Sequence, residues 1–295
     1  MERALNAAAL QRIGDQTDIL GESAVWCDSE RALYWVDIRA CAVRRWHSLT
    51  GAVVSWDMPD LVGSIALREK GGLLVALRDA LALFEPASGS FKQVAAPEAG
   101  HADMRCNEGR CDRQGRFWFG TMNNITRGPE GSLYRLDDRH ICVKVSSGIQ
   151  IPNSLAWSPD GRTMYFADSL EYTIYAYEFD PESGTLGERR TFAQTVPPAI
   201  PDGSAVDADG YLWNAEYNGW RITRYTPDGS IDRRVELPVQ NPTSCTFGGP
   251  DLTILYVTTA TQRLTAEELA SQPLAGAVLA FNTYVRGLPE PRYID

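Results

Sequence analysis

Short runs of alternating apolar and polar residues recur along the whole chain. In each recurrence a short apolar segment is followed by a polar turn, usually with Asp or Gly, and then by a segment in which aromatic and apolar residues alternate. This two-residue period is typical of β-strands, and such turns typically join antiparallel strands. The six recurrences are GESAVWCDSERALYWVD from residue 21, GSIALREKGGLLVAL from 63, NEGRCDRQGRFWFGT from 107, NSLAWSPDGRTMYFAD from 153, DGSAVDADGYLWNAE from 202 and TSCTFGGPDLTILYVT from 243.

The recurrences are regularly spaced. Equivalent positions near their starts lie 41 to 49 residues apart; these are Glu22, Gly63, Asn107, Asn153, Asp202 and Thr243. A period of about 40 to 50 residues matches one four-stranded blade of a β-propeller. The sequence therefore predicts an all-β fold, a six-bladed β-propeller with four antiparallel strands per blade, as a single domain over residues 1–295.

Three further features refine this prediction. An apolar residue follows each equivalent position by four residues, and we expect it to project from the same strand face; these residues are Trp26, Leu67, Cys111, Trp157, Val206 and Phe247. The segment TAEELASQ, residues 265–272, predicts a short helix inserted in the last blade. The segment AALQRIG near residue 10 is expected to complete the sixth blade as a strand borrowed from the N-terminus.

The first strand of each propeller blade lines the central channel, so the six equivalent positions should converge at one channel mouth. Glu22 and Asp202 would bring two carboxylates together there, and these repel unless a cation or a proton intervenes. Asn153 adds a neutral amide oxygen, while Gly63 and Thr243 leave room for water. Oxygen ligands with few histidines predict one divalent cation: calcium, magnesium or manganese, with zinc and ferrous iron also compatible.

Each member of this candidate metal set also has a plain structural interpretation. The PDG at 201–203 matches a common turn that recurs at 159–161 and 227–229. Asn153 is suited to capping a turn, and Glu22 to a solvated rim. The coincidence of all three in one ring favours a site.

Arg105 precedes Asn107 by two residues on the same predicted strand, so both side chains should face the channel. A guanidinium at the mouth would offer paired donors to a carboxyl or hydroxyl oxygen of a substrate. The alternative is an ion pair between Arg105 and either Asp103 or Glu108.

Composition excludes several classes of function. The formal net charge of -10 disfavours nucleic-acid binding and attachment to anionic membranes. No basic start followed by an apolar run resembles a secretory signal, and no apolar stretch approaches bilayer length, so we expect a cytoplasmic protein. The 6 cysteines are scattered without zinc-finger spacing and are expected to be free thiols.

The ordered set of motifs resembles the gluconolactonase, regucalcin and senescence-marker-protein family of six-bladed propellers, over nearly the whole chain. The motifs are LGES with Glu22, RCNEG with Arg105 and Asn107, GRFWFGTM at 115–122, PNSLAWSPDG with Asn153 and IPDGSAVDADGYLW with Asp202. The sequence departs from the family pattern at Ser23-Ala24, at Glu108, and after GTM, where a family carboxylate falls near Asn124 or Ile125.

The resemblance implies that Glu22, Asn153 and Asp202 bind one divalent metal, with calcium, zinc, manganese and ferrous iron as candidates, and that Arg105 and Asn107 hold the substrate. It implies hydrolysis of a sugar lactone to the aldonic acid, closest to L-arabinono-1,4-lactone in an oxidative pentose pathway, with gluconolactone or xylonolactone as alternatives. Asp202 is the expected general base, and a metal-bound hydroxide is the alternative nucleophile. We expect a monomer or weak dimer.

Two other classes of function remain open at this point. A metal-dependent esterase acting on non-sugar esters would require a drier, more aromatic channel mouth than this polar ring. A non-catalytic calcium-binding propeller is compatible with the same metal residues, since fold does not imply function. Substrate choice is expected to depend on the loops at 123–131 and 265–275.

Overall fold

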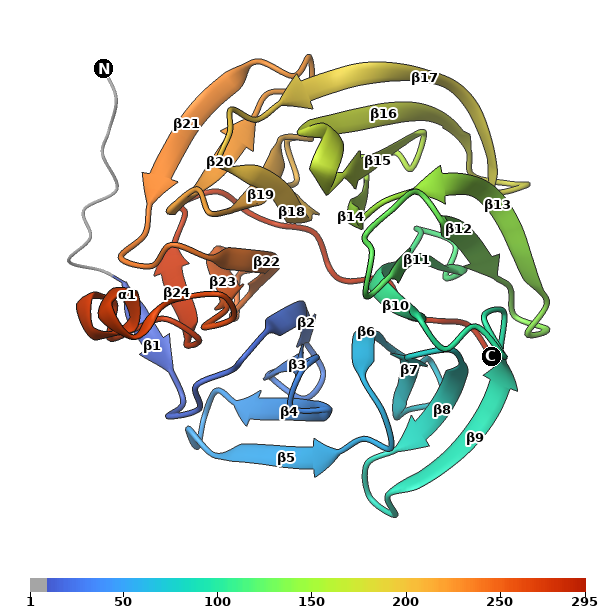
Figure 1. Ribbon diagram of the computed structural model, residues 1–295, viewed down its shortest axis with the longest axis horizontal. Helices are drawn as coiled ribbons and strands as arrows, with labels where there is room; N and C mark the ends of the chain where they lie inside the picture. Colours follow the sequence, from blue (N-terminus) through green and yellow to red (C-terminus); the bar gives the residue numbers. More distant parts are fainter. Residues whose placement is uncertain (1–9) are drawn as a thin grey trace.

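The computed structural model describes residues 10–295 and consists of six four-stranded antiparallel sheets arranged around a central axis (Figure 1). The predicted six-bladed β-propeller is therefore confirmed. In each of the first five blades the chain enters at the axis and moves outward strand by strand. Each blade thus presents its first strand to the central channel.

The first three blades follow the chain in order. Blade 1 contains β2 (Gly21–Cys27), β3 (Ala32–Asp37), β4 (Ala42–His47) and β5 (Val53–Asp57). Blade 2 contains β6 (Val62–Leu67), β7 (Leu73–Leu77), β8 (Leu81–Glu85) and β9 (Ser90–Ala95). Blade 3 contains β10 (Met104–Cys111), β11 (Phe117–Asn123), β12 (Gly131–Leu136) and β13 (Cys142–Ile149).

The next two blades repeat this arrangement. Blade 4 contains β14 (Pro152–Trp157), β15 (Thr163–Asp168), β16 (Thr173–Asp180) and β17 (Thr185–Gln194), with the short 3-10 turn η2 (Ser169–Glu171) between β15 and β16. Blade 5 contains β18 (Ile200–Val206), β19 (Leu212–Tyr217), β20 (Arg221–Tyr225) and β21 (Ile231–Glu236).

The sixth blade joins the two ends of the described chain. It contains β22 (Pro242–Gly248), β23 (Ile254–Thr259) and β24 (Val278–Asn282), and its outermost strand is β1 (Gln11–Ile13). Gln11 pairs with Ala280 and Ile13 with Val278. The prediction that an N-terminal strand completes this blade is confirmed; residues 8 and 9 of AALQRIG lie outside the described residues.

The predicted helix is also present, as α1 (Ala266–Ser271) between β23 and β24. It starts with a capping box in which the Thr265 side chain accepts from the backbone N–H of Glu268 and the Glu268 carboxylate accepts from the backbone N–H of Thr265. Within residues 10–295, no helix is long and apolar enough to cross a membrane.

Burial increases from the rim toward the axis. Every residue of the inner strands β2, β6, β10, β14 and β22 is buried, whereas the outer strand β5 is mostly exposed. Large aromatic side chains fill the wedge between neighbouring blades: Trp26 of blade 1 stacks on Tyr256 of blade 6 with ring centroids 5.4 Å apart. This packing holds the inner strands, and the polar side chains at their ends, in fixed positions.

A β-bulge lies near the start of every inner strand. In β2, Val25 follows Glu22 by three positions, whereas their partners on β3, Val36 and Tyr34, are two positions apart, so β2 has one extra residue. The other five inner strands have an equivalent register shift. The expectation that Glu22 and Trp26 project from the same strand face is therefore wrong, because the extra residue between them inverts the alternation.

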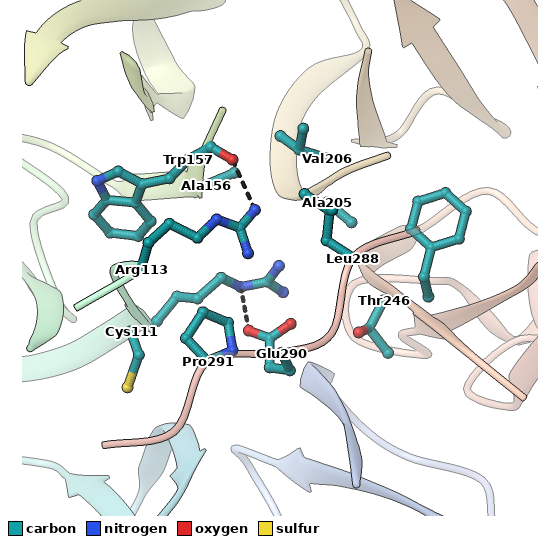
Figure 2. Close-up of a pocket in the computed structure, with 12 residues that line it drawn as sticks. Cys111, Arg113, Ala156, Trp157, Ala205, Val206, Thr246, Leu288, Glu290 and Pro291 are labelled. Atoms are coloured by element: carbon teal, nitrogen blue, oxygen red, sulfur yellow. Dashed lines mark hydrogen bonds and ion pairs between the residues drawn. The ribbon is translucent and has the colours of Figure 1, made fainter. Parts of the chain in front are cut away.

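The C-terminal segment, residues 285–295, runs across the centre of the ring in red in Figure 1. It lies at the end of the channel where the inner strands end. Tyr293 is fully buried and its hydroxyl donates to the Asp137 carbonyl over 2.7 Å. A small pocket remains beside this segment (Figure 2). There Glu290 forms an ion pair with Arg110, and Arg113 donates to the Trp157 carbonyl over 3.0 Å.

Candidate active site at the channel mouth

The candidate site is a pocket at the end of the channel where the inner strands begin. All five residues singled out from the sequence line this pocket; they are Glu22, Arg105, Asn107, Asn153 and Asp202. They come from four blades, and each is only 4–6% exposed. The fold therefore brings the predicted set together in one buried place.

The other two ring positions do not line the pocket. Thr243 is fully buried and its hydroxyl bonds to the Gly21 carbonyl of blade 1. A Cβ on Gly63 would lie only 2.4 Å from the Cys106 carbonyl oxygen, so glycine is needed where blades 2 and 3 approach. Both positions therefore form contacts between neighbouring blades. The expectation that they leave room for water at the channel mouth is not met.

Two carboxylates give the site its unusual electrostatics. Burial, with the negative charge of Glu108 as the next cause, raises the pKa of Glu22 to about 8. Burial and the charge of Glu22 raise the pKa of Asp202 well above its ordinary value. Arg105 acts in the opposite direction on both groups. Two desolvated carboxylates in one pocket are a costly arrangement for a protein without a bound cation.

The donor set fits a hard divalent cation. Asp202 Oδ1 is buried and accepts no hydrogen bond within residues 10–295, so it has free ligating capacity. No cluster of three His, Cys, Asp or Glu side chains suited to a metal occurs in the described part of the chain, so a cation at this mouth would need the amide oxygen of Asn153 as a third protein ligand.

A hydrogen-bond chain orients Asn153. Its Nδ2 donates to Ser169 Oγ over 2.8 Å, and that hydroxyl donates to the Pro201 carbonyl over 2.7 Å. Its Oδ1 accepts from Asn107 Nδ2 at 3.1 Å and keeps a second lone pair. Such partners hold a ligand oxygen in place before a metal binds.

Asn107 and Arg105 are coupled to each other. Arg105 Nη1 donates to Asn107 Oδ1 over 2.7 Å and to the Cys106 carbonyl over 2.9 Å. Asn107 Nδ2 donates to the Pro152 carbonyl and to Asn153, so both of its N–H groups are used inside the protein. Asn107 thus fixes the relative positions of Arg105 and Asn153.

The alternative interpretation of Arg105 as a partner of Asp103 or Glu108 is wrong. Within residues 10–295, Arg105 has no carboxylate within ion-pair distance. Its Nε instead donates to Asn124 Oδ1 over 3.1 Å. Burial, and then the positive charge of Arg39, lower the pKa of Arg105 to about 10.

Sequence reasoning missed two residues at this mouth. Arg39, in the turn between β3 and β4, donates through Nε to Gln262 Oε1 over 2.7 Å and through Nη2 to Asn124 Oδ1 over 3.2 Å. Arg39 and Gln262 lie in loops outside the repeated strand pattern, so no periodic signal marks them. Of the two positions considered after GTM, Asn124 faces the site and Ile125 is 70% exposed.

Comparison with known proteins gives consistent matches. Residues 20–261 match the family described as SMP-30/Gluconolactonase/LRE-like region. The 6-deoxy-6-sulfogluconolactonase of Pseudomonas putida is 37% identical over 280 residues, 94% of this chain and 96% of that protein. The L-arabinolactonase of Azospirillum brasilense is 37% identical over 298 residues, 99% of this chain and 98% of that protein.

A solved structure agrees with these matches. The calcium-binding regucalcin of Agrobacterium tumefaciens superposes with a TM-score of 0.92 at 29% identity, with 96% of each chain covered. The resemblance inferred from the motifs is confirmed over almost the full length. The chain belongs to the SMP-30/gluconolactonase/LRE-like family.

Proposed function

We propose that the protein is a metal-dependent lactonase, a hydrolase that opens a sugar lactone to the corresponding aldonic acid. The observation that carries this proposal is the pair of buried carboxylates, Glu22 and Asp202, in one pocket with an oriented amide and a guanidinium. The names of the two bacterial relatives, both lactonases at 37% identity, support the reaction class.

Glu22, Asn153 and Asp202 would hold the cation. The unpartnered Asp202 Oδ1 and the raised pKa of both carboxyl groups support this assignment, since a cation offsets the cost of burying two charges. The chemistry that a bound divalent cation would supply here is Lewis-acid polarisation of the lactone carbonyl. Calcium, zinc, manganese and ferrous iron are the candidates, and the name of the Agrobacterium protein supports calcium.

The pocket side chains have separate roles in the proposed hydrolysis. The Asp202 carboxylate accepts a proton from the water whose oxygen attacks the lactone carbonyl carbon, and returns it to the ring oxygen when the carbon–oxygen bond breaks. Arg105 Nη2 forms no hydrogen bond within the described residues and is available to a substrate oxygen, while Nη1 and Nε hold the guanidinium in place. Asn107 keeps Arg105 and Asn153 in register.

The identity of the sugar lactone is a more specific part of the proposal. A pentonolactone such as L-arabinono-1,4-lactone, with a role in arabinose catabolism, is expected from the sequence and supported by the name of the Azospirillum relative. The Pseudomonas relative, at the same identity, is named for a sulfonated hexonolactone. Cytoplasmic location and a monomer or weak dimer stay predictions from the sequence.

The test is turnover after removal of metal. The protein is treated with chelator, and proton release is followed on fresh aldonolactones with calcium, zinc, manganese or ferrous iron added back singly. We expect one metal to restore turnover on a sugar lactone. Asp202→Asn should lose most of that turnover, by about 100-fold or more if Asp202 is the base, while remaining folded.

Asp209→Asn is the matched control, because Asp209 is an exposed carboxylate in the turn between β18 and β19. Near-normal kcat in Asp202→Asn would remove Asp202 from the chemistry. A folded protein that binds metal but opens no lactone would contradict the proposed activity and favour a metal-binding propeller.

A further inference from the structure

Two guanidinium groups converge on a single neutral oxygen at the channel mouth. Arg39 Nη2 and Arg105 Nε both donate to Asn124 Oδ1, over 3.2 Å and 3.1 Å. Like charges this close repel, and the repulsion contributes to the lowered pKa of Arg105. An amide oxygen satisfies one hydrogen bond from each arginine but neutralises neither charge.

The wider pocket has the same imbalance. Arg105, Arg127 and Arg263 line it, Arg39 contacts the lining residue Gln262, and among residues 10–295 the carboxylates that line it are Glu22 and Asp202, the proposed metal ligands. Within residues 10–295, none of Arg39, Arg105, Arg127 and Arg263 lies within ion-pair distance of a carboxylate. With a divalent cation on the two carboxylates, the mouth carries an excess of positive charge.

The arginine pair is held in place before any ligand arrives. Gln262 Oε1 accepts from Arg39 Nε over 2.7 Å, and Asp37 Oδ1 accepts from the Arg39 backbone N–H over 3.1 Å. Arg105 is fixed by Asn107 and the Cys106 carbonyl. Arg39 Nη1 and Arg105 Nη2 have no hydrogen-bond acceptor among the described residues, so donors on both guanidiniums remain available.

A neutral sugar requires acceptors for its hydroxyl hydrogens as well as donors for its oxygens. Among the described residues, this pocket supplies guanidinium donors in excess and, apart from the proposed metal ligands, no carboxylate acceptor. Planar, paired N–H groups match the oxygens of sulfonate, phosphate and carboxylate groups.

We propose that the lactone substrate carries an anionic substituent, remote from the scissile ester, that binds between Arg39 and Arg105. This rests on the proposed lactonase function and narrows its substrate class: it replaces the neutral pentonolactone expected from the sequence with a lactone that carries an anionic group. The shared chemistry is a group with two or three negatively charged oxygens. Sulfonate, phosphate and carboxylate are the three sources to be distinguished.

The test compares lactones that differ only at the terminal carbon. Four gluconolactones are assayed with the metal-loaded protein: the parent 6-hydroxyl compound and its 6-sulfonate, 6-phosphate and 6-carboxylate counterparts. We expect at least one anionic compound to exceed the neutral parent in kcat/KM by about 10-fold or more, as a charge-assisted hydrogen bond allows. The ranking among the three identifies the substituent.

Two variants then test whether the preference for anionic lactones depends on the pair Arg39 and Arg105. Arg39→Gln should reduce kcat/KM for the best anionic lactone about 10-fold more than for the neutral one. Asn124→Asp, nearly isosteric, places a carboxylate between the two guanidiniums and should also reduce the anionic preference about 10-fold. Arg139→Gln, on the opposite face with a side chain 75% exposed, is the matched control and should change neither rate.

Equal kcat/KM for neutral and anionic lactones, or an equal effect of Arg39→Gln on both, would overturn the inference while leaving the lactonase function standing. Absence of turnover on all four compounds and on pentonolactones would instead contradict the lactonase function. In that case calorimetry with 6-phosphogluconate and gluconate still tests the anion site. Tighter binding of the phosphorylated compound that disappears in Arg39→Gln supports it, and equal binding overturns it.

Discussion

Removing the buried charge at Glu22 should change how the metal-free protein depends on pH. Burial raises the pKa of this carboxyl from 4.5 to about 8 in the folded state. Between these values the folded chain holds a proton that the unfolded chain has lost, so the free energy of unfolding falls as pH rises through this window. For a carboxylate paired with a cation, the free energy of unfolding would instead rise with pH, because its pKa is lowered in the folded state.

The size of the effect follows from the same shift. Each unit of pKa difference corresponds to about 1.4 kcal/mol, so Glu22 alone should lower the free energy of unfolding by about 2 to 3 kcal/mol between about pH 5 and about pH 7. Glu22→Gln carries no titrating group and should be less pH-dependent by this amount. Glu108 and Asp202, whose pKa values are also raised, still titrate in both proteins. The difference between the two proteins therefore reports Glu22 together with the part of the Asp202 pKa shift that the charge of Glu22 causes.

The assay is urea unfolding in chelator at several pH values, for the parent protein, Glu22→Gln and the exposed control Glu188→Gln. Adding the active metal should reverse the trend in the parent protein, because cation binding favours the ionised carboxylates. A parent protein whose stability is flat or rises from pH 5 to pH 7, or a Glu22→Gln variant with the parent's slope, would refute the reasoning.

Three further predictions concern the fold that positions the site. Gly63→Ala places a methyl group 2.4 Å from the Cys106 carbonyl oxygen and should cost about 1 to 3 kcal/mol in urea unfolding, so an unchanged midpoint would contradict the close approach of blades 2 and 3. Asp207→Asn leaves the buried Arg224 without its 2.7 Å charge partner and should cost about 3 kcal/mol, whereas a loss below 1 kcal/mol would indicate that Asp232 compensates. Tyr293→Phe removes the hydroxyl bonded to Asp137 and should lower stability by about 1 to 2 kcal/mol, while Tyr284→Phe, 81% exposed, should have no effect on thermal unfolding.

The strands were predictable because their signal is local. Inner strands such as GESAVWC are buried throughout and apolar in their second half, and the turns that follow carry Asp or Gly at fixed places. In CDRQGRFW and VDADGYLW, the side chains of Asp112 and Asp207 accept from backbone N–H groups of the turn and from the indole N–H of Trp118 and Trp213. Turn and strand partner are thus encoded within seven residues.

The bulges limited what periodicity could predict. Simple alternation correctly placed Arg105 beside Asn107, although Asn107 lies within the register shift between Cys106 and Gly109. It failed for Glu22 and Trp26, where an extra residue intervenes. Ser23 adopts a positive φ of 51°, a conformation that its sequence context does not announce.

By itself, the sequence determined the number of blades, the strand that closes the ring and the five inner-strand polar residues at the channel mouth, because these follow from a repeat in the chain and the two-residue period of its strands. Only the tertiary structure decided which loops meet there. Arg39 contacts Asn124, 85 positions away, and Gln262, 223 positions away. Such contacts exist only after six blades have closed into a ring, and no local pattern along the chain encodes the geometry of that closure.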